Sequence, residues 1–151
     1  MTEDLLSLAD ELANRDSGRP RQASLRRAVA TAYYALFHAL AKLCADQLVG
    51  PSKPWDVYTP VYRSVDHSAA RKVLREARNH SFDPAIAPVA LSFVKLHDAR
   101  LAADYIPEPL GFSRQQTRDL IQEARGAARA IDALSPDTKL RLAVQFVTKV
   151  R

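Results

Sequence analysis

The chain has little cysteine, little glycine and no long apolar run, and each shortage excludes a class of protein. Its single cysteine, Cys44, allows no disulfide within the chain and no metal cluster built from cysteines. With only 4 glycines among 151 residues, it has no glycine-rich phosphate loop. No apolar run approaches the roughly 20 residues that cross a bilayer, and residues 1–14 carry acids instead of the basic start of a signal peptide. We therefore expect a cytoplasmic protein without a membrane segment.

The histidines form no metal-binding pattern. They are scattered over separate segments, at His38, His67, His80 and His97. No His-x3-His pair occurs, and no serine or cysteine stands in an arrangement that would activate it as a nucleophile. Cys44 lies on an apolar helical stripe, which indicates a core position. We expect neither a metal nor a cofactor.

The charge balance is basic, with 22 lysines and arginines against 17 acids and a net charge of +5. Such a balance is compatible with a polyanionic partner such as RNA. Most of the basic residues are arginines, which suit bidentate phosphate contacts. A genome rich in G and C would give the same arginine bias, so the charge alone decides nothing.

The breakers and the apolar periodicity predict an all-α protein. Most of the 9 prolines fall in 51–60, 84–88 and 107–109, which separates long stretches of helical periodicity. Thr2, Ser113 and Ser135 stand where N-caps are expected. The expected helices are 2–14, 22–49, 67–78, 84–105, 113–134 and 135–150, while 55–65 fits a short helix or a loop. We predict an antiparallel four-helix bundle over 1–134 with extra short helices, followed by a C-terminal helix in 135–151.

Two of these helices carry more than one patterned face. Helix 22–49 has two adjacent apolar stripes, which indicates a central helix, and its remaining side is polar and aromatic: Arg27, Thr31, Tyr34, His38 and Lys42. The C-terminal helix has Leu140 and Val144 on one side and Leu142 and Phe146 on the other. It either covers its own bundle or docks on a second subunit.

Two segments resemble a known family. Residues 26–39 read RRAVATAYYALFHA, a helix with a tyrosine pair followed by a histidine, and residues 97–105 read HDARLAADY. Together with the His67-Ser68 pair, they resemble an uncharacterised prokaryotic branch of the HEPN family with an Arg-x-x-Ala-Asp-Tyr signature. The resemblance covers about residues 2–134. It implies a helical bundle, a homodimer, metal-independent ribonuclease activity and a nucleotidyltransferase-like antitoxin partner.

The chain departs from the family's catalytic motif, in which an arginine is followed after four to six residues by a histidine. Arg100 matches the arginine, but Tyr105 stands in the position of the histidine, and Leu101 replaces a frequent polar residue. Tyrosine is a poor base at neutral pH, although it can donate a hydrogen bond or stack on a base. His97, Arg100 and Asp104 share one helical face, so His97 would replace the missing base. The alternative is a solvated face with an Arg100–Asp104 ion pair.

A second arginine–histidine pair lies one helix earlier. Arg75 and His80 have the family spacing and stand beside further basic side chains, at Arg71, Lys72 and Arg78. This basic run fits phosphate contacts, catalysis or a plain solvated face.

Other aromatic and basic side chains have two interpretations each. Arg27, Tyr34 and His38 either line the RNA cleft or form a dimer seam or an interhelical hydrogen-bond network. Trp55 and Tyr58 either stack on bases or anchor their proline-rich loop to the bundle.

Two functions follow from these patterns. The first is a HEPN-like RNA-binding protein with weak ribonuclease activity in a toxin–antitoxin-type system. The second is a non-catalytic module that dimerises or binds a protein partner. Tyr105 in the position of the catalytic histidine favours the second.

Overall fold

A computed structural model describes residues 1–52, 54–80 and 83–148, and for 77–80 it describes the backbone only. These residues form helices and no strand, so the all-α prediction is confirmed. The helices are α1 (Thr2–Asn14), α2 (Gln22–Leu48), α3 (Trp55–Arg63), α4 (His67–His80), α5 (Ile86–Tyr105), α6 (Arg114–Asp132) and α7 (Pro136–Val147).

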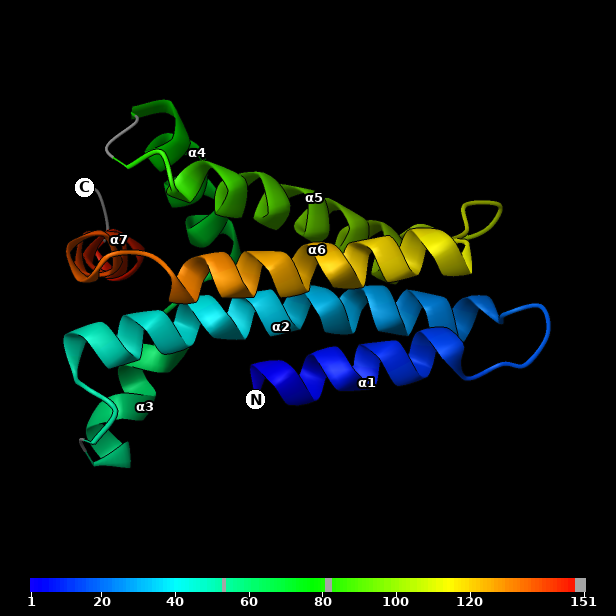
Figure 1. Ribbon diagram of the computed structural model, residues 1–151, viewed down its shortest axis with the longest axis horizontal. Helices are drawn as coiled ribbons and strands as arrows, with labels where there is room; N and C mark the ends of the chain where they lie inside the picture. Colours follow the sequence, from blue (N-terminus) through cyan, green and yellow to red (C-terminus); the bar gives the residue numbers. More distant parts are fainter. Residues whose placement is uncertain (53, 81–82, 149–151) are drawn as a thin grey trace.

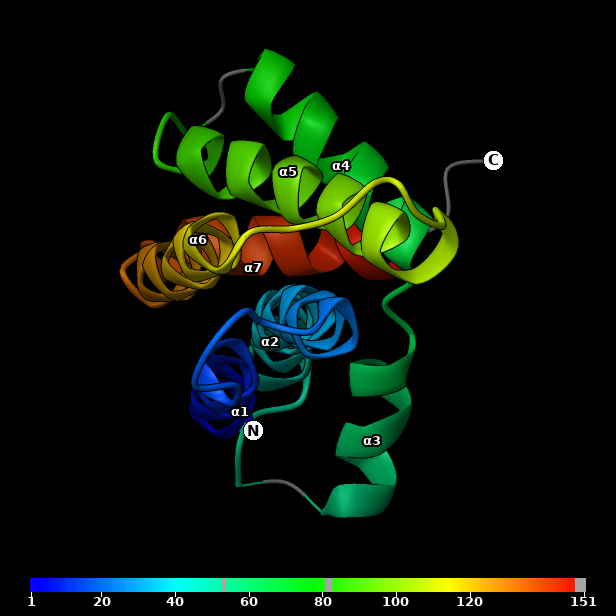
Figure 2. The same cartoon turned by 90° about the vertical axis from the view of Figure 1, so that its right-hand side faces the viewer.

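The helices are arranged around α2, which packs against α1, α3, α5, α6 and α7. In Figure 1, α1, α2, α5 and α6 run along the longest axis, and helices that follow one another in this set are antiparallel. α7 is seen end-on there and crosses behind α2 and α6 in Figure 2. α4 lies on α5, and α3 projects from the C-terminal end of α2.

The central position predicted for α2 is confirmed. Leu36 and Leu40 from one apolar stripe, and Tyr33 and Cys44 from the other, are fully buried. Burial raises the pKa of the Cys44 thiol to about 12, so it is an inert core side chain. The helix ends at Leu48, and two residues later Gly50 has a φ of 102°, which glycine adopts without strain.

The length and composition of α2 also match a membrane span, contrary to the expectation that no segment does. Within the fold, 72% of its most apolar 18-residue window is buried. A core helix of a soluble protein passes the same test, so the match is weak evidence of a membrane.

Two of the three predicted N-caps are confirmed. The Ser113 hydroxyl accepts from the Gln116 backbone N–H in a full capping box, and the Ser135 hydroxyl accepts from the Thr138 N–H. The prediction for Thr2 is wrong, because Met1 is the N-cap of α1 and Thr2 already belongs to the helix. Because Thr2 lies inside the helix, its backbone has helical φ and ψ. Its hydroxyl therefore does not reach the free N–H groups of the first turn.

The C-terminal helix packs on its own chain through one face. Leu142 and Phe146 are buried, and α7 contacts α2 and α4. Leu140 and Val144 on the other face are 45% and 42% exposed. The helix ends at Val147, three residues before the predicted end, and 149–151 lie outside the described residues.

Candidate functional site

Polar and aromatic side chains from α2, α4 and α5 meet at one seam of the fold. We call this group the Arg100 cluster; its members are Tyr33, Tyr34, Phe37, His67, Arg71, His97, Arg100, Asp104 and Tyr105. The cluster joins residues that are up to 72 positions apart in the chain, from Tyr33 to Tyr105. It therefore exists only in the tertiary structure.

Arg100 is at the centre of the cluster and is only 15% exposed at its side chain. Its guanidinium donates to the Tyr34 hydroxyl at 2.9 Å, and Nε lies 2.8 Å from Asp104 Oδ2 without the alignment of a hydrogen bond. The charge also lies 5.4–5.9 Å from the ring centres of Tyr33, Tyr34 and Tyr105. The Arg100–Asp104 ion pair of the alternative interpretation is present, but the solvated face expected with it is wrong for Arg100 and His97, because both side chains pack against α2.

His97 is held in place on every side, which weakens its case as a replacement base. It is buried at 8% exposure and stacks on Tyr33, with ring centres 5.3 Å apart. Arg71 donates to its Nδ1 at 3.2 Å and to Asp98 at 2.6 Å. Since an arginine is always a donor, His97 Nδ1 is an acceptor and the ring is neutral. Burial lowers the pKa of His97, and the Arg71 charge lowers it further.

His67 is the second histidine of the cluster. Its Nδ1 lies 2.6 Å from the Tyr33 hydroxyl, and its ring stacks on Phe37 with ring centres 3.9 Å apart. The side chain is half-buried, and the nearby Arg100 charge adds to burial in lowering its pKa. Unlike His97, it forms no hydrogen bond with an arginine among the described residues. The sequence predicts no functional role for His67; its only signal is the His67-Ser68 pair, which does not indicate which helix the side chain faces.

The predicted network on the polar side of α2 is present. Tyr34 bonds to α5 through Arg100, and His38 Nδ1 lies 2.5 Å from the Tyr62 hydroxyl of α3. Both bonds match the interhelical interpretation of this stripe. Arg27 lies on the same stripe two turns before Tyr34, and its side chain is exposed.

The other predicted residues stand at the surface. Tyr105 is 71% exposed beside Arg100 at the end of α5. Lys72 and Arg75 face solvent, and Lys72 Nζ lies 4.0 Å from a carboxylate of its own helix. The expected basic face is thus smaller, since Arg71 turns inward to α5. The side chains of two further predicted residues, Arg78 and His80, lie outside the described residues.

The anchoring role considered for Trp55 and Tyr58 applies to one of them. Tyr58 is buried, and its hydroxyl donates to Asp46 of α2 at 2.7 Å. Trp55 is 76% exposed, so it does not hold the segment to the helices.

Within the described part of the chain, no group of three or more histidine, cysteine, aspartate or glutamate side chains is placed to hold a metal ion. Comparisons of the chain with protein-family models, with curated proteins and with solved structures find no match.

Proposed function

We propose that this chain is an RNA-binding protein of the HEPN type, with α1, α2, α5 and α6 as its four-helix bundle. Its ribonuclease activity would be weak and metal-independent, in a homodimer that works with a nucleotidyltransferase-like antitoxin. One observation carries the proposal: Arg100, the exposed ring of Tyr105 and the half-buried His67 belong to one cluster. An arginine beside an open aromatic ring suits a phosphate next to an unstacked base.

The cluster also contains the groups that RNA cleavage needs. The ribose 2′-OH loses a proton, its oxygen attacks phosphorus, and the 5′-oxygen leaves with a proton. Arg100 would stabilise the charge on the phosphoryl oxygens. His67 is the better proton acceptor of the two cluster histidines, because no arginine in the described part of the chain bonds to its ring, whereas Arg71 donates to His97. When Nδ1–H donates to the Tyr33 hydroxyl, Nε2 has a free lone pair for the 2′ proton.

The test is cleavage of a mixed cellular RNA pool in EDTA by the wild type and by Arg100→Ala, His67→Ala, His97→Ala and His80→Ala. We expect Arg100→Ala to abolish cleavage and His67→Ala to reduce it at least tenfold. Arg125→Ala is the matched control, because Arg125 is 19% exposed and pairs with an aspartate on the far side of α2. Loss of cleavage in Arg125→Ala as well would point to misfolding.

RNA binding, measured without cleavage, gives a separate readout. We expect the affinity of the wild type to fall steeply between low and physiological salt, because each neutralised phosphate releases counterions. Binding that ignores salt, or a folded wild type that neither binds nor cleaves RNA, would rule the proposal out.

One observation favours the non-catalytic alternative. Arg100 and Arg71 donate hydrogen bonds to side chains of their own chain, to Tyr34, His97 and Asp98, instead of pointing to solvent where a phosphate would bind. Leu101, Tyr105 and Ile106 form an exposed apolar group at the same end of α5. If this group is a dimer seam, Tyr105→Asp will convert a dimer to a monomer in analytical ultracentrifugation while RNA binding stays absent.

A further inference from the structure

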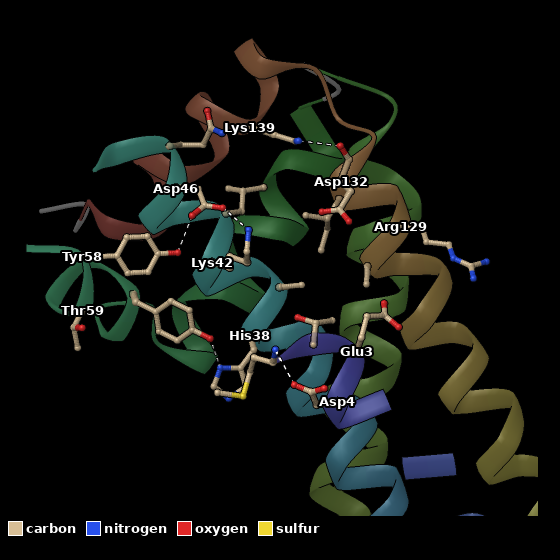
Figure 3. Close-up of a pocket in the computed structure, with 18 of the residues that line it drawn as sticks. Glu3, Asp4, His38, Lys42, Asp46, Tyr58, Thr59, Arg129, Asp132 and Lys139 are labelled. Atoms are coloured by element: carbon tan, nitrogen blue, oxygen red, sulfur yellow. Dashed lines mark hydrogen bonds and ion pairs between the residues drawn. The ribbon is translucent and has the colours of Figure 1, made fainter. Parts of the chain in front are cut away.

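A cavity of about 690 Å³ lies at the other end of α2, away from Arg100. Its walls come from the start of α1, the C-terminal half of α2, most of the length of α3, the end of α6 and the start of α7. This volume is within the range of small-molecule sites. Figure 3 shows side chains from these elements around it.

The walls combine aromatic and aliphatic surface. Tyr58 and Tyr62 of α3 and His38 of α2 supply rings, and Leu43 and Ile131 supply aliphatic surface. Tyr62 and His38 are stacked with ring centres 5.7 Å apart, and their polar edges bond to each other. The aromatic wall is therefore rigid and already formed, as a pocket for a flat ring requires.

Trp55 stands at this cavity with most of its surface open. It lines the cavity, is 76% exposed, and meets Tyr58 edge-on with ring centres 5.3 Å apart. Because most of its surface is exposed, the indole has an open face for a stacking partner. Since Trp55 does not anchor its segment, folding gives no reason for its exposure.

The polar groups of the cavity divide into satisfied and free ones. Asp46 is satisfied, since Lys42 and Tyr58 both bond to it. Lys139 is half-buried and donates to the Asp132 backbone carbonyl at 2.9 Å, and its ammonium forms no ion pair within the described residues. The Asp132 carboxylate forms none there either. In Figure 3, Asp132 and Lys139 lie on the same side of the opening, and Arg129 points away.

We propose that this cavity binds a nucleotide, with its base stacked on Trp55 and its phosphate on Lys139. The nucleotide is either free or an unstacked residue of single-stranded RNA; the RNA form rests on the function proposed above, and the free form does not.

A row of neighbouring aromatic rings connects this cavity to the Arg100 cluster. It runs from Trp55 through Tyr58, Tyr62, His38, Phe37 and His67 to Tyr34, with neighbouring ring centres 3.9–6.2 Å apart. Only its first member has most of its surface exposed, and at the other end Tyr105 is exposed beside Arg100. These two open rings would hold two bases of one strand, because base stacking on an aromatic ring tolerates any base.

The single tryptophan of the chain makes the proposal testable directly. AMP, adenosine and ribose 5-phosphate are titrated against the intrinsic fluorescence of the full chain, and binding is repeated by calorimetry. We expect AMP to quench Trp55 in a saturable way, adenosine to bind at least several-fold more weakly, and ribose 5-phosphate to leave the fluorescence unchanged. Equal binding of ribose 5-phosphate, or no binding of AMP, would overturn the proposal.

Variants separate stacking from general effects. Trp55→Ala is expected to weaken AMP binding in calorimetry by roughly tenfold or more. Val57→Ala is the matched control, because Val57 is an exposed side chain of the same helix that does not line the cavity. Both variants change surface residues, so neither should unfold the chain. Unchanged AMP affinity in Trp55→Ala would reject the stacking role.

An oligonucleotide arm separates this proposal from the proposed function. A single-stranded oligoadenylate is tested against Trp55→Ala and Arg100→Ala, and AMP against Arg100→Ala. AMP binding that survives Arg100→Ala, with no oligoadenylate binding, assigns the cavity to free nucleotides and removes the RNA function. Oligoadenylate binding that depends on Arg100 but not on Trp55, with no AMP binding, keeps the RNA function and overturns the cavity site.

Discussion

At the scale of single residues, burial affects the titration of three histidines. It lowers the pKa values of His38, His67 and His97 below the ordinary value of 6.5. Just below pH 6.5 the unfolded chain binds protons that the folded chain excludes, so the free energy of unfolding falls as the pH falls. Above pH 7 both states are neutral and this contribution is complete.

We therefore expect the free energy of unfolding, from urea titrations at pH 5 to 8, to be level above pH 7 and to decrease below about pH 6.5. The slope is at most about 1.4 kcal/mol per pH unit for each histidine. His97→Gln should flatten the profile relative to the wild type. A stability that rises on acidification through this window would contradict the assignment of neutral rings.

Tyr33 gives a second test at this scale. Its ring is fully buried, and its hydroxyl contacts His67 Nδ1 at 2.6 Å. Tyr33→Phe leaves that nitrogen without a partner and should cost roughly 1–2 kcal/mol in urea unfolding. Tyr105→Phe serves as control, because Tyr105 is 71% exposed; it should change stability by less than about 0.5 kcal/mol. Equal effects in both variants would mean that the Tyr33–His67 bond is not stabilising.

At the scale of the elements, Arg26 of α2 caps the C-terminal end of α5. Arg26 donates to the carbonyls of Ala102 and Ala103 at 3.3 and 3.0 Å and to those of Ile106 and Leu110 at 2.5 Å each. The last carbonyls of a helix have no partner within it, and a cation there also complements the helix dipole. This contact keeps Arg100 and Tyr105 at a fixed position relative to α2.

Arg26→Lys should accordingly destabilise the chain by roughly 1–2 kcal/mol, since an ammonium cannot reach four carbonyls in a planar fork. Arg27→Lys is the matched control at the next position, where the side chain is exposed. It should change the free energy of unfolding by less than about 0.5 kcal/mol. Thermal or urea unfolding measures both changes. A similar loss of unfolding free energy in the two variants would reject the capping role of Arg26.

At the scale of the whole molecule, α7 closes the fold by packing across α2 and α4. Phe146 is 4% exposed in that contact, while Val144 on the outer face is 42% exposed. Phe146→Ala should cost about 3–5 kcal/mol, because it leaves a cavity between three helices. Val144→Ala should change stability by less than about 0.5 kcal/mol for the isolated chain. A large loss in Val144→Ala that grows with protein concentration would place a second subunit on that face.

The sequence by itself determined the helices and the central position of α2. Apolar period and breakers act locally, so the bounds of α1 and α2 were predicted to within a residue or two, and the serine caps of α6 and α7 were read from adjacent residues. It also marked Arg100, Tyr34 and His97 as members of polar faces. A periodicity shows which side chains share a face and leaves open what that face meets.

Only the tertiary structure decided what those faces contact. The turn of Arg71 inward, the pairing of His67 with Tyr33 and the exposure of Trp55 each depend on how α3 and α4 lie against α2 and α5. These contacts join residues 26 to 34 positions apart, and no local pattern encodes such a distance. The resulting cluster and the cavity at the other end of α2 are products of helix packing.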